Sequence, residues 1–89
     1  MNNKQVLAAL AMDLKRVAMG YHRGSIAMSD RFFKEALKRR NEIDSKNLKP
    51  YLVFFLKKME NLKKGRNDRV AEDALLYSII FQNASVMIP

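Results

Sequence analysis

The sequence contains no cysteine and no tryptophan, and it has only two prolines, three glycines and one histidine. Without cysteine the chain has no disulfide framework, no thiolate metal site and no thiol nucleophile. No apolar run approaches the roughly 18 residues that a membrane-spanning helix needs, so we expect no membrane span. A lack of disulfides is compatible with a reducing compartment, and we expect a cytoplasmic protein.

Acidic residues are scarce relative to basic ones. The 89 residues include 17 Lys and Arg against 9 Asp and Glu, which gives a formal net charge of +8. The positive charge is concentrated between residues 31 and 69, whereas residues 70–89 contain two acidic residues and no Lys or Arg. This asymmetry fits binding to an anionic partner, and it fits a solvated basic surface equally well.

The dominant pattern in the sequence is a helical apolar period. Apolar residues recur at a spacing of three and four over about residues 3–21, 25–44 and 50–64, and the segment after residue 67 is apolar almost all round. The stretches "YLVFFL" and "LLYSIIF" leave strands as the alternative there. A length of 89 residues fits one domain, residues 1–89. We therefore predict an all-α fold, a small bundle of three to four helices.

The stretch "MGYHRGSI", residues 19–26, decides whether the first two segments are one helix or two. An unbroken helix over residues 3–44 would be about 63 Å long, roughly twice the width of a compact chain of this length, and would imply an extended dimer. Gly20 and Gly24 each cost about 1 kcal/mol inside a helix, and Ser25 is a good N-cap. We favour a break near residues 22–25 and keep the long helix as the alternative.

The same stretch holds the single histidine, His22. No carboxylate lies three or four residues from it, and the sequence contains no nucleophile elbow, phosphate loop or dinucleotide-binding fingerprint. A histidine near a helix C-terminus interacts favourably with the helix dipole. We therefore predict a helix joint with no catalytic residue, no metal site and no cofactor, and expect no enzymatic activity.

Arg16 and His22, in "RVAMGYH", are separated by five residues. This spacing resembles the arginine–histidine motif of the HEPN ribonucleases, helical dimers in which the two side chains of each subunit act on the RNA 2′-hydroxyl. The resemblance covers these seven residues, and it implies a ribonuclease site at Arg16 and His22. The family motif lies late in its domain, however, and six positions along a straight helix place two side chains about 240° apart. HEPN-like activity is thus a minor alternative.

Phe54 stands out in the third segment. With Leu52 facing the core, Phe54 points roughly 160° away from it. Its helical neighbours at positions i+3, i+4 and i+7 are Lys57, Lys58 and Asn61. An exposed aromatic among lysines favours partner binding, either to a nucleic-acid base and its phosphates or as the apolar centre of a protein contact. The alternative is that another part of this chain, or a second copy, covers Phe54.

A basic stripe in the second segment supplies candidate phosphate contacts, which would make binding depend on salt: Arg31, Lys34, Lys38 and Arg39. Two acidic residues interrupt this stripe. Arg40 projects into the apolar arc of the segment, and we expect it to extend toward solvent or to pair with Asp44.

The last segment contains more apolar residues than one buried face needs. A helix that is apolar nearly all round is buried on most sides or lies in a subunit interface. We predict an oligomer interface formed by Leu76, Ile80 and Phe81. The sequence thus favours a non-enzymatic helical interaction or adaptor protein that forms a homodimer, with a basic nucleic-acid-binding module as the alternative.

Overall fold

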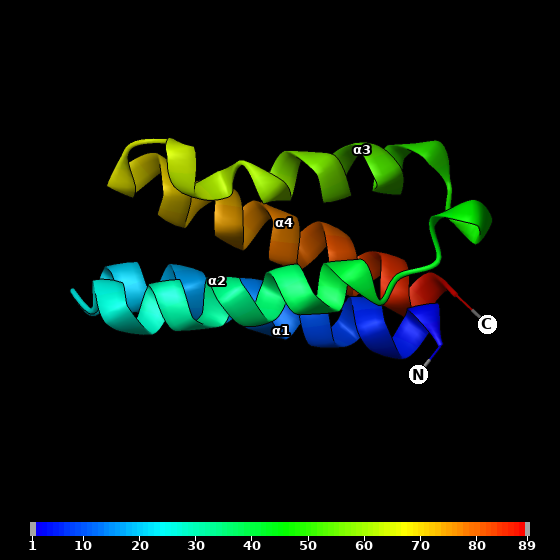
Figure 1. The fold of residues 1–89 in the computed structure, drawn as a ribbon, viewed down its shortest axis with the longest axis horizontal. Coiled ribbons are helices and arrows are strands. Elements are labelled where there is room, and N and C mark those ends of the chain that lie inside the picture. Colours follow the sequence, from blue (N-terminus) through cyan, green and yellow to red (C-terminus); the bar gives the residue numbers. More distant parts are fainter. Residues whose placement is uncertain (1, 89) are drawn as a thin grey trace.

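The computed structural model describes residues 2–88, which form four α-helices joined by short connections. The helices are α1 (Asn3–His22), α2 (Ile26–Asn41), α3 (Pro50–Glu60) and α4 (Asn67–Met87), with 3-10 turns η1 (Ser45–Asn47) and η2 (Leu62–Lys64). Successive helices run in opposite directions, and both chain ends lie at one end of the molecule (Figure 1). The predicted all-α bundle is confirmed.

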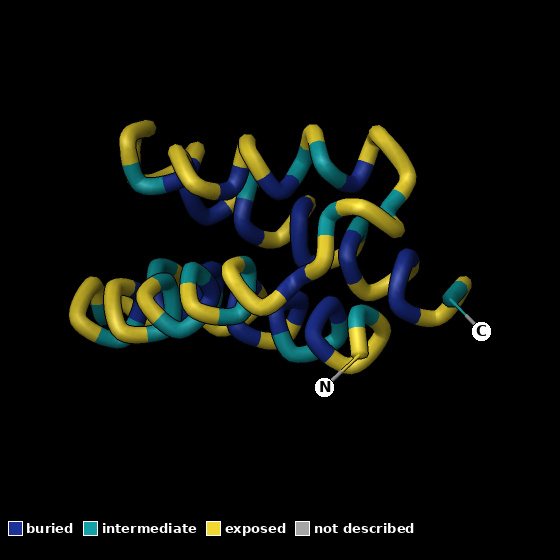
Figure 2. Tube along the Cα trace, turned by 45° about the vertical axis from the view of Figure 1, so that its right-hand side comes forward, coloured by how far each residue is buried: buried dark blue, intermediate teal, exposed yellow. Residues whose placement is uncertain are grey.

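The four helices are arranged as two layers around one core. Helix α1 packs against α2 and α4, and α3 packs against α4. In Figure 1, α2 and α3 lie in front of α1 and α4. The buried positions of the helices face the space between them (Figure 2). The largest fully buried side chains come from three helices and include Leu7, Leu10, Leu14, Leu56, Met59 and Phe81.

Local signals in the sequence set where the helices begin. The Asn2 side chain accepts a hydrogen bond from the Gln5 backbone N–H at 2.9 Å, and the Gln5 side chain accepts one from the Asn2 N–H at 3.4 Å. This is a reciprocal capping box for α1. The Ser25 hydroxyl accepts from the Met28 N–H at 3.2 Å and caps α2. Pro50 is the first residue of α3, where its missing N–H costs nothing.

The joint between α1 and α2 forms where the sequence predicts it, so residues 3–44 are two helices. Gly24 has φ +73°, a left-handed conformation that favours glycine. The Ser25 N–H donates to the Gly20 carbonyl at 2.8 Å. A Cβ on Gly20 would lie 2.8 Å from the Ser29 backbone nitrogen. Gly20 therefore permits the close approach of the two helices, and Gly24 permits the turn.

Several predicted helix ends are wrong. Helix α2 ends at Asn41 instead of residue 44. Helix α3 ends at Glu60 instead of residue 64, and η2 follows it before Gly65, whose backbone is extended with φ −84°. Helix α4 continues through "ASVM". Ala84 and Ser85 are buried and continue the inward face of α4, so packing extends the helix.

Candidate interaction surfaces

An exposed apolar surface runs along α4 from residue 75 to residue 87. Its members follow one another at helical spacing, and we call them the α4 surface: Leu75, Leu76, Ile79, Gln82, Asn83, Val86 and Met87. Leu76 is 50% exposed and Ile79 is 51% exposed. No charged residue follows Asp73 in the sequence. The α4 surface is therefore uncharged, in a chain whose net charge is +8.

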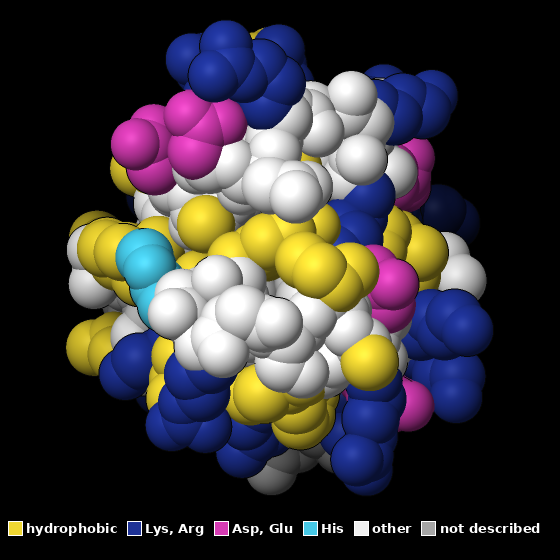
Figure 3. All heavy atoms as spheres, turned by 90° about the vertical axis from the view of Figure 1, so that its left-hand side faces the viewer, with side chains coloured by type: hydrophobic (Ala, Val, Ile, Leu, Met, Phe, Trp, Pro, Cys, Tyr) yellow, Lys and Arg dark blue, Asp and Glu magenta, His cyan; other side chains and the backbone are white. Residues whose placement is uncertain are grey.

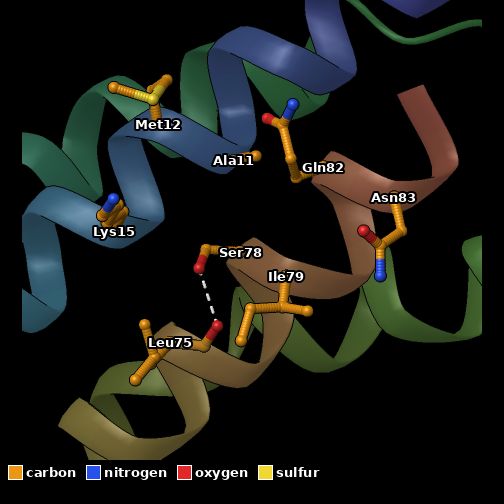
Figure 4. A pocket seen from close by; sticks show the side chains of 8 residues that line it. All are labelled: Ala11, Met12, Lys15, Leu75, Ser78, Ile79, Gln82 and Asn83. Atoms are coloured by element: carbon orange, nitrogen blue, oxygen red, sulfur yellow. Dashed lines mark hydrogen bonds between the residues drawn. The ribbon is translucent and has the colours of Figure 1, made fainter. Parts of the chain in front are cut away.

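A groove of about 480 Å³ lies between the α4 surface and α1. Figure 4 shows Met12 and Lys15 on the α1 side of this groove and Leu75 and Ile79 on the α4 side. The Ser78 hydroxyl donates to the Leu75 carbonyl at 2.7 Å, so it is satisfied within its own helix. Lys15 contributes the one charged group of the lining. The groove thus continues the apolar character of α4 onto α1.

The structure exposes only part of the oligomer interface that we predicted from the sequence. Leu76 is exposed and belongs to the α4 surface, but Phe81 is 0% exposed and lies in the core of the chain itself. Ile80 is half-buried and packs against that core. Phe81 therefore offers no surface to a second chain. The exposed positions that sequence reasoning missed are Leu75, Ile79, Val86 and Met87, with Met12 of α1 beside them.

The outward face of α3 carries the predicted combination of an aromatic ring and lysines. We call its residues the α3 surface: Tyr51, Phe54, Lys57, Lys58 and Asn61. Phe54 is 53% exposed, as predicted, and the Lys58 Nζ lies 5.4 Å from the centre of its ring. Within residues 2–88, packing thus leaves about half of Phe54 open to solvent, and Tyr51 is exposed as well.

The basic stripe of α2 is partly neutralised. Arg31, Lys34 and Lys38 are exposed, but Lys38 Nζ lies 3.4 Å from Glu35 Oε1. Arg39 is half-buried, and it pairs with Asp13 of α1 and with Glu42, the residue that follows α2. The stripe therefore has fewer cations available to phosphate than its sequence indicates.

The carboxylate of Asp13 is buried beside two arginines that hold it loosely. Its two oxygens lie 3.8 Å from Arg16 Nη1 and 3.8 Å from Arg39 Nε, beyond hydrogen-bonding distance. Burial raises the pKa of Asp13 above its ordinary value, and the attraction of Arg39 and Arg16 offsets only part of that rise. The charged form of Asp13 is therefore a cost to the folded state.

Arg40 has a different partner from the one we predicted. Its Nε lies 2.6 Å from Glu60 Oε1, so it connects α2 to α3 instead of pairing with Asp44. The Asp44 side chain instead accepts hydrogen bonds from the Lys46 N–H and the Asn47 amide in η1. The ion pair also neutralises Glu60, which is the one carboxylate of α3.

Arg16 and His22 lie in different surroundings along α1. Helix α1 is continuous through both residues, and the Arg16 guanidinium lies 5.3 Å from the ring centre of Phe32 on α2. His22 is exposed and lines a shallow hollow with Asp68 and Glu72 at the start of α4. Figure 3 views this end of the molecule, where Lys and Arg side chains are spread around the rim instead of gathered at the histidine. Arg16 thus contacts α2, whereas His22 faces the start of α4.

No protein-family model, curated protein or solved structure matches this chain. Within residues 2–88, no helix has the length and apolarity needed to cross a membrane. In the same residues, no three His, Asp or Glu side chains converge as metal ligands.

A half-buried lysine forms a polar cluster that the sequence did not reveal. Lys63 Nζ lies 2.7 Å from Asp30 Oδ1, and it donates to the Tyr21 hydroxyl at 2.6 Å and to the Ser29 hydroxyl at 3.3 Å. Burial alone would lower the pKa of Lys63, but the hydrogen bonds with Asp30 and Tyr21 outweigh it and hold the pKa above its ordinary value. This lysine ties η2 to the joint between α1 and α2.

Proposed function

We propose that this chain is a non-enzymatic helical interaction protein that forms a homodimer through the α4 surface. The observation that carries the proposal is the exposure of Leu76, Ile79 and Val86 on a helix face without charge. Contiguous exposed apolar surface on a small protein is typical of an interaction site. Contact with another apolar face removes this surface from water, which is the main favourable term in association.

A second copy of the chain is the partner that the charges favour. Two molecules of net charge +8 repel each other, and the α4 surface is a region where they can meet without juxtaposing Lys or Arg. A two-fold interface places the same surface on both subunits. If two α4 helices pair antiparallel about Ile79, the exposed Glu72 of each copy approaches the C-terminal end of the other helix. Lys4 lies at that end, with Nζ 2.8 Å from the Ile88 carbonyl oxygen. Such a pairing would therefore bring opposite charges of the two copies toward each other.

The size of the molecule supports the same contact. Its extents are 37 × 20 × 19 Å. The area of one long side is therefore close to the area that each partner buries in a standard protein interface, about 800 Å². The α1–α4 side also has a groove that a protruding side chain can enter. A small chain without disulfides gains stability by burying further surface in an oligomer.

The non-enzymatic part of the proposal is supported by the arrangement of the polar side chains. Arg16 lies over Phe32, and His22 lies exposed at the end of α1. Lys63 and Asp30 satisfy each other in a cluster that joins structural elements. Arg16 and Lys63 therefore have partners within the fold, on different elements from each other. The lack of cysteine supports the cytoplasm as the proposed location.

The test compares two matched charge insertions. Ile79 and Phe54 are 51% and 53% exposed, so Ile79→Lys and Phe54→Lys add the same charge at equally exposed sites on different surfaces. Light-scattering mass is measured over a concentration series for the wild type and both variants, with circular dichroism as the check on folding. We expect the wild type and Phe54→Lys to give twice the chain mass of 10.3 kDa. We expect Ile79→Lys to give the monomer mass.

Two results would contradict the proposal. One is a wild-type chain that stays monomeric at about 100 μM, since a physiological dimer of this kind has a dissociation constant well below that value. The other is a dimer that persists in Ile79→Lys, because a lysine at the centre of an apolar contact leaves buried charge without a partner.

A further inference from the structure

We propose that the α3 surface binds single-stranded nucleic acid, with bases stacked on Phe54 and Tyr51 and phosphates held by the lysines around them. This site lies on a different helix from the α4 surface and does not depend on dimer formation. The inference starts from two exposed aromatic rings three residues apart, which places them on neighbouring turns of one helix face. Proteins that bind single strands use such rings as stacking platforms, together with a basic track for the backbone.

The charges along α3 provide that basic track. Five exposed lysines form no ion pair with a carboxylate in residues 2–88, and they lie before, on and after the helix: Lys46, Lys49, Lys57, Lys58 and Lys64. Glu60 is the one acidic residue between positions 45 and 67. Arg40 of α2 pairs with Glu60 at 2.6 Å, so the one carboxylate of this stretch is neutralised from within the fold.

Contacts with neighbouring side chains fix the position of the Phe54 ring. The Phe54 and Phe55 rings form a T-shaped contact with ring centres 5.2 Å apart, and Phe55 packs in turn on Tyr77 of α4. Lys58 Nζ lies 5.4 Å from the centre of the Phe54 ring, close enough to reach the phosphate of a nucleotide stacked there. Much of the Phe54 ring remains exposed to solvent, and this exposed part is the proposed stacking surface.

The same features favour a single strand over a duplex or a membrane. A duplex keeps its bases stacked inside, whereas a protruding ring needs unpaired bases. A helix that lies on a membrane inserts a continuous apolar face, but Leu52, Leu56 and Met59 of α3 are buried in the core. The separated rings of Phe54 and Tyr51 are then what α3 offers to lipid, whereas bases of a single strand can stack on both rings.

The test uses a fluorescein-labelled single-stranded DNA of 12 nucleotides and mixed sequence, titrated by fluorescence anisotropy at 50 and 150 mM KCl. We expect binding whose log–log salt slope is about −2 to −3.5, because a single strand contributes about −0.7 for each of three to five phosphates neutralised. Phe54→Leu keeps an apolar side chain of similar exposure and removes the π-face. We expect it to weaken binding at least about fivefold, the low end of the loss when a stacked base loses its ring, with the salt slope unchanged.

A second readout reports stacking directly. The chain has no tryptophan, so Phe54→Trp places a single indole at the proposed platform, and we expect the unlabelled oligonucleotide to bind this variant and quench its fluorescence. Ile79→Trp is the matched control on the α4 surface, and its emission should stay unquenched. Lys58→Gln should reduce the magnitude of the salt slope by about 0.7, the share of one phosphate. Circular dichroism checks that each variant is folded.

Several outcomes would overturn the assignment. Equal affinity of the wild type and Phe54→Leu would show that cations alone attract the DNA, without stacking. Tighter binding to the matching duplex would place the contact on the backbone of paired DNA. The absence of binding at 50 mM KCl and 100 μM protein would remove the site. Preferential binding to vesicles with 30% phosphatidylserine, retained in Phe54→Leu, would identify a membrane contact in its place.

Discussion

Gly20→Ala is a substitution for which helix propensity and packing predict opposite effects on the free energy of unfolding. Gly20 lies within α1, and replacing a glycine inside a helix by alanine stabilises that helix by about 1 kcal/mol. At this position, however, the new Cβ would lie 2.8 Å from the Ser29 nitrogen and 3.0 Å from both the Ser25 carbonyl oxygen and the Ser29 Cα. All three are backbone atoms, so no side-chain rotation relieves the contact.

The structure gives the size of the effect. Ordinary contact begins near 3.4 Å, so the first turn of α2 must move about 0.6 Å away from α1. Forcing extra volume into a packed contact costs about 1–3 kcal/mol. The movement also strains the hydrogen bond from the Ser25 N–H to the Gly20 carbonyl, now 2.8 Å long, which contributes about 1 kcal/mol. After the gain in helix propensity is subtracted, we expect a net loss of about 1–3 kcal/mol.

The assay is urea unfolding followed by circular dichroism at a fixed protein concentration, because a dimer makes apparent stability depend on concentration. A thermal scan should show a melting temperature lower by at least about 4 °C. Gly65→Ala is the control, since its Cβ would meet its nearest neighbour at 3.7 Å, and it should leave stability equal or slightly higher. Gly24→Ala has open space but φ +73°, and should lose about 1–2 kcal/mol through backbone strain alone. A Gly20→Ala protein as stable as the wild type would refute the reasoning.

Two further predictions concern buried charges. Because the folded-state pKa of Asp13 is raised from 3.8, protonated Asp13 stabilises the fold, and this contribution is complete below pH 3.8 and lost as pH rises through the folded pKa. Denaturation at a series of pH values should therefore show that Asp13→Asn gains stability relative to the wild type as pH rises through that range. A stability difference that stays constant with pH would contradict the burial effect. Lys63→Met removes the ammonium from Asp30, Tyr21 and Ser29 and should cost about 1–3 kcal/mol at pH 7. Since the pKa of Lys63 is raised from 10.5, the stability advantage of the wild type over Lys63→Met should be complete below pH 10.5 and disappear as pH rises through the folded pKa. A stability advantage that persists above the folded pKa would point to lost packing instead.

The features that sequence reasoning predicted correctly depend on local periodicity and local backbone conformation. The outward position of Phe54 follows from the rotation of 100° per residue once Leu52 faces inward, and Leu52 is buried. The joint at residues 22–25 follows from Gly20, Gly24 and the capping residue Ser25, which act within a few residues of one another.

The features that sequence reasoning missed depend on contacts between helices. Helix α4 is apolar nearly all round, so its sequence does not distinguish the side that α1 covers from the side left exposed, and Phe81 was placed in an interface although it lies in the core. The partner of Arg40 is Glu60, twenty positions away on another helix, and helical spacing points only to neighbours such as Asp44. Residues that lie far apart in sequence meet only after the helices have packed.

The two proposed surfaces are separated by the same packing that defines the fold. The α4 surface borders α1, whereas the α3 surface points away from the contact between α3 and α4. A two-fold pairing through α4 would therefore leave both α3 surfaces accessible, and a strand long enough to reach both would gain from the effective concentration that the first contact creates. The two proposals thus concern different layers of the fold, with self-association proposed for α4 and nucleic-acid binding proposed for α3.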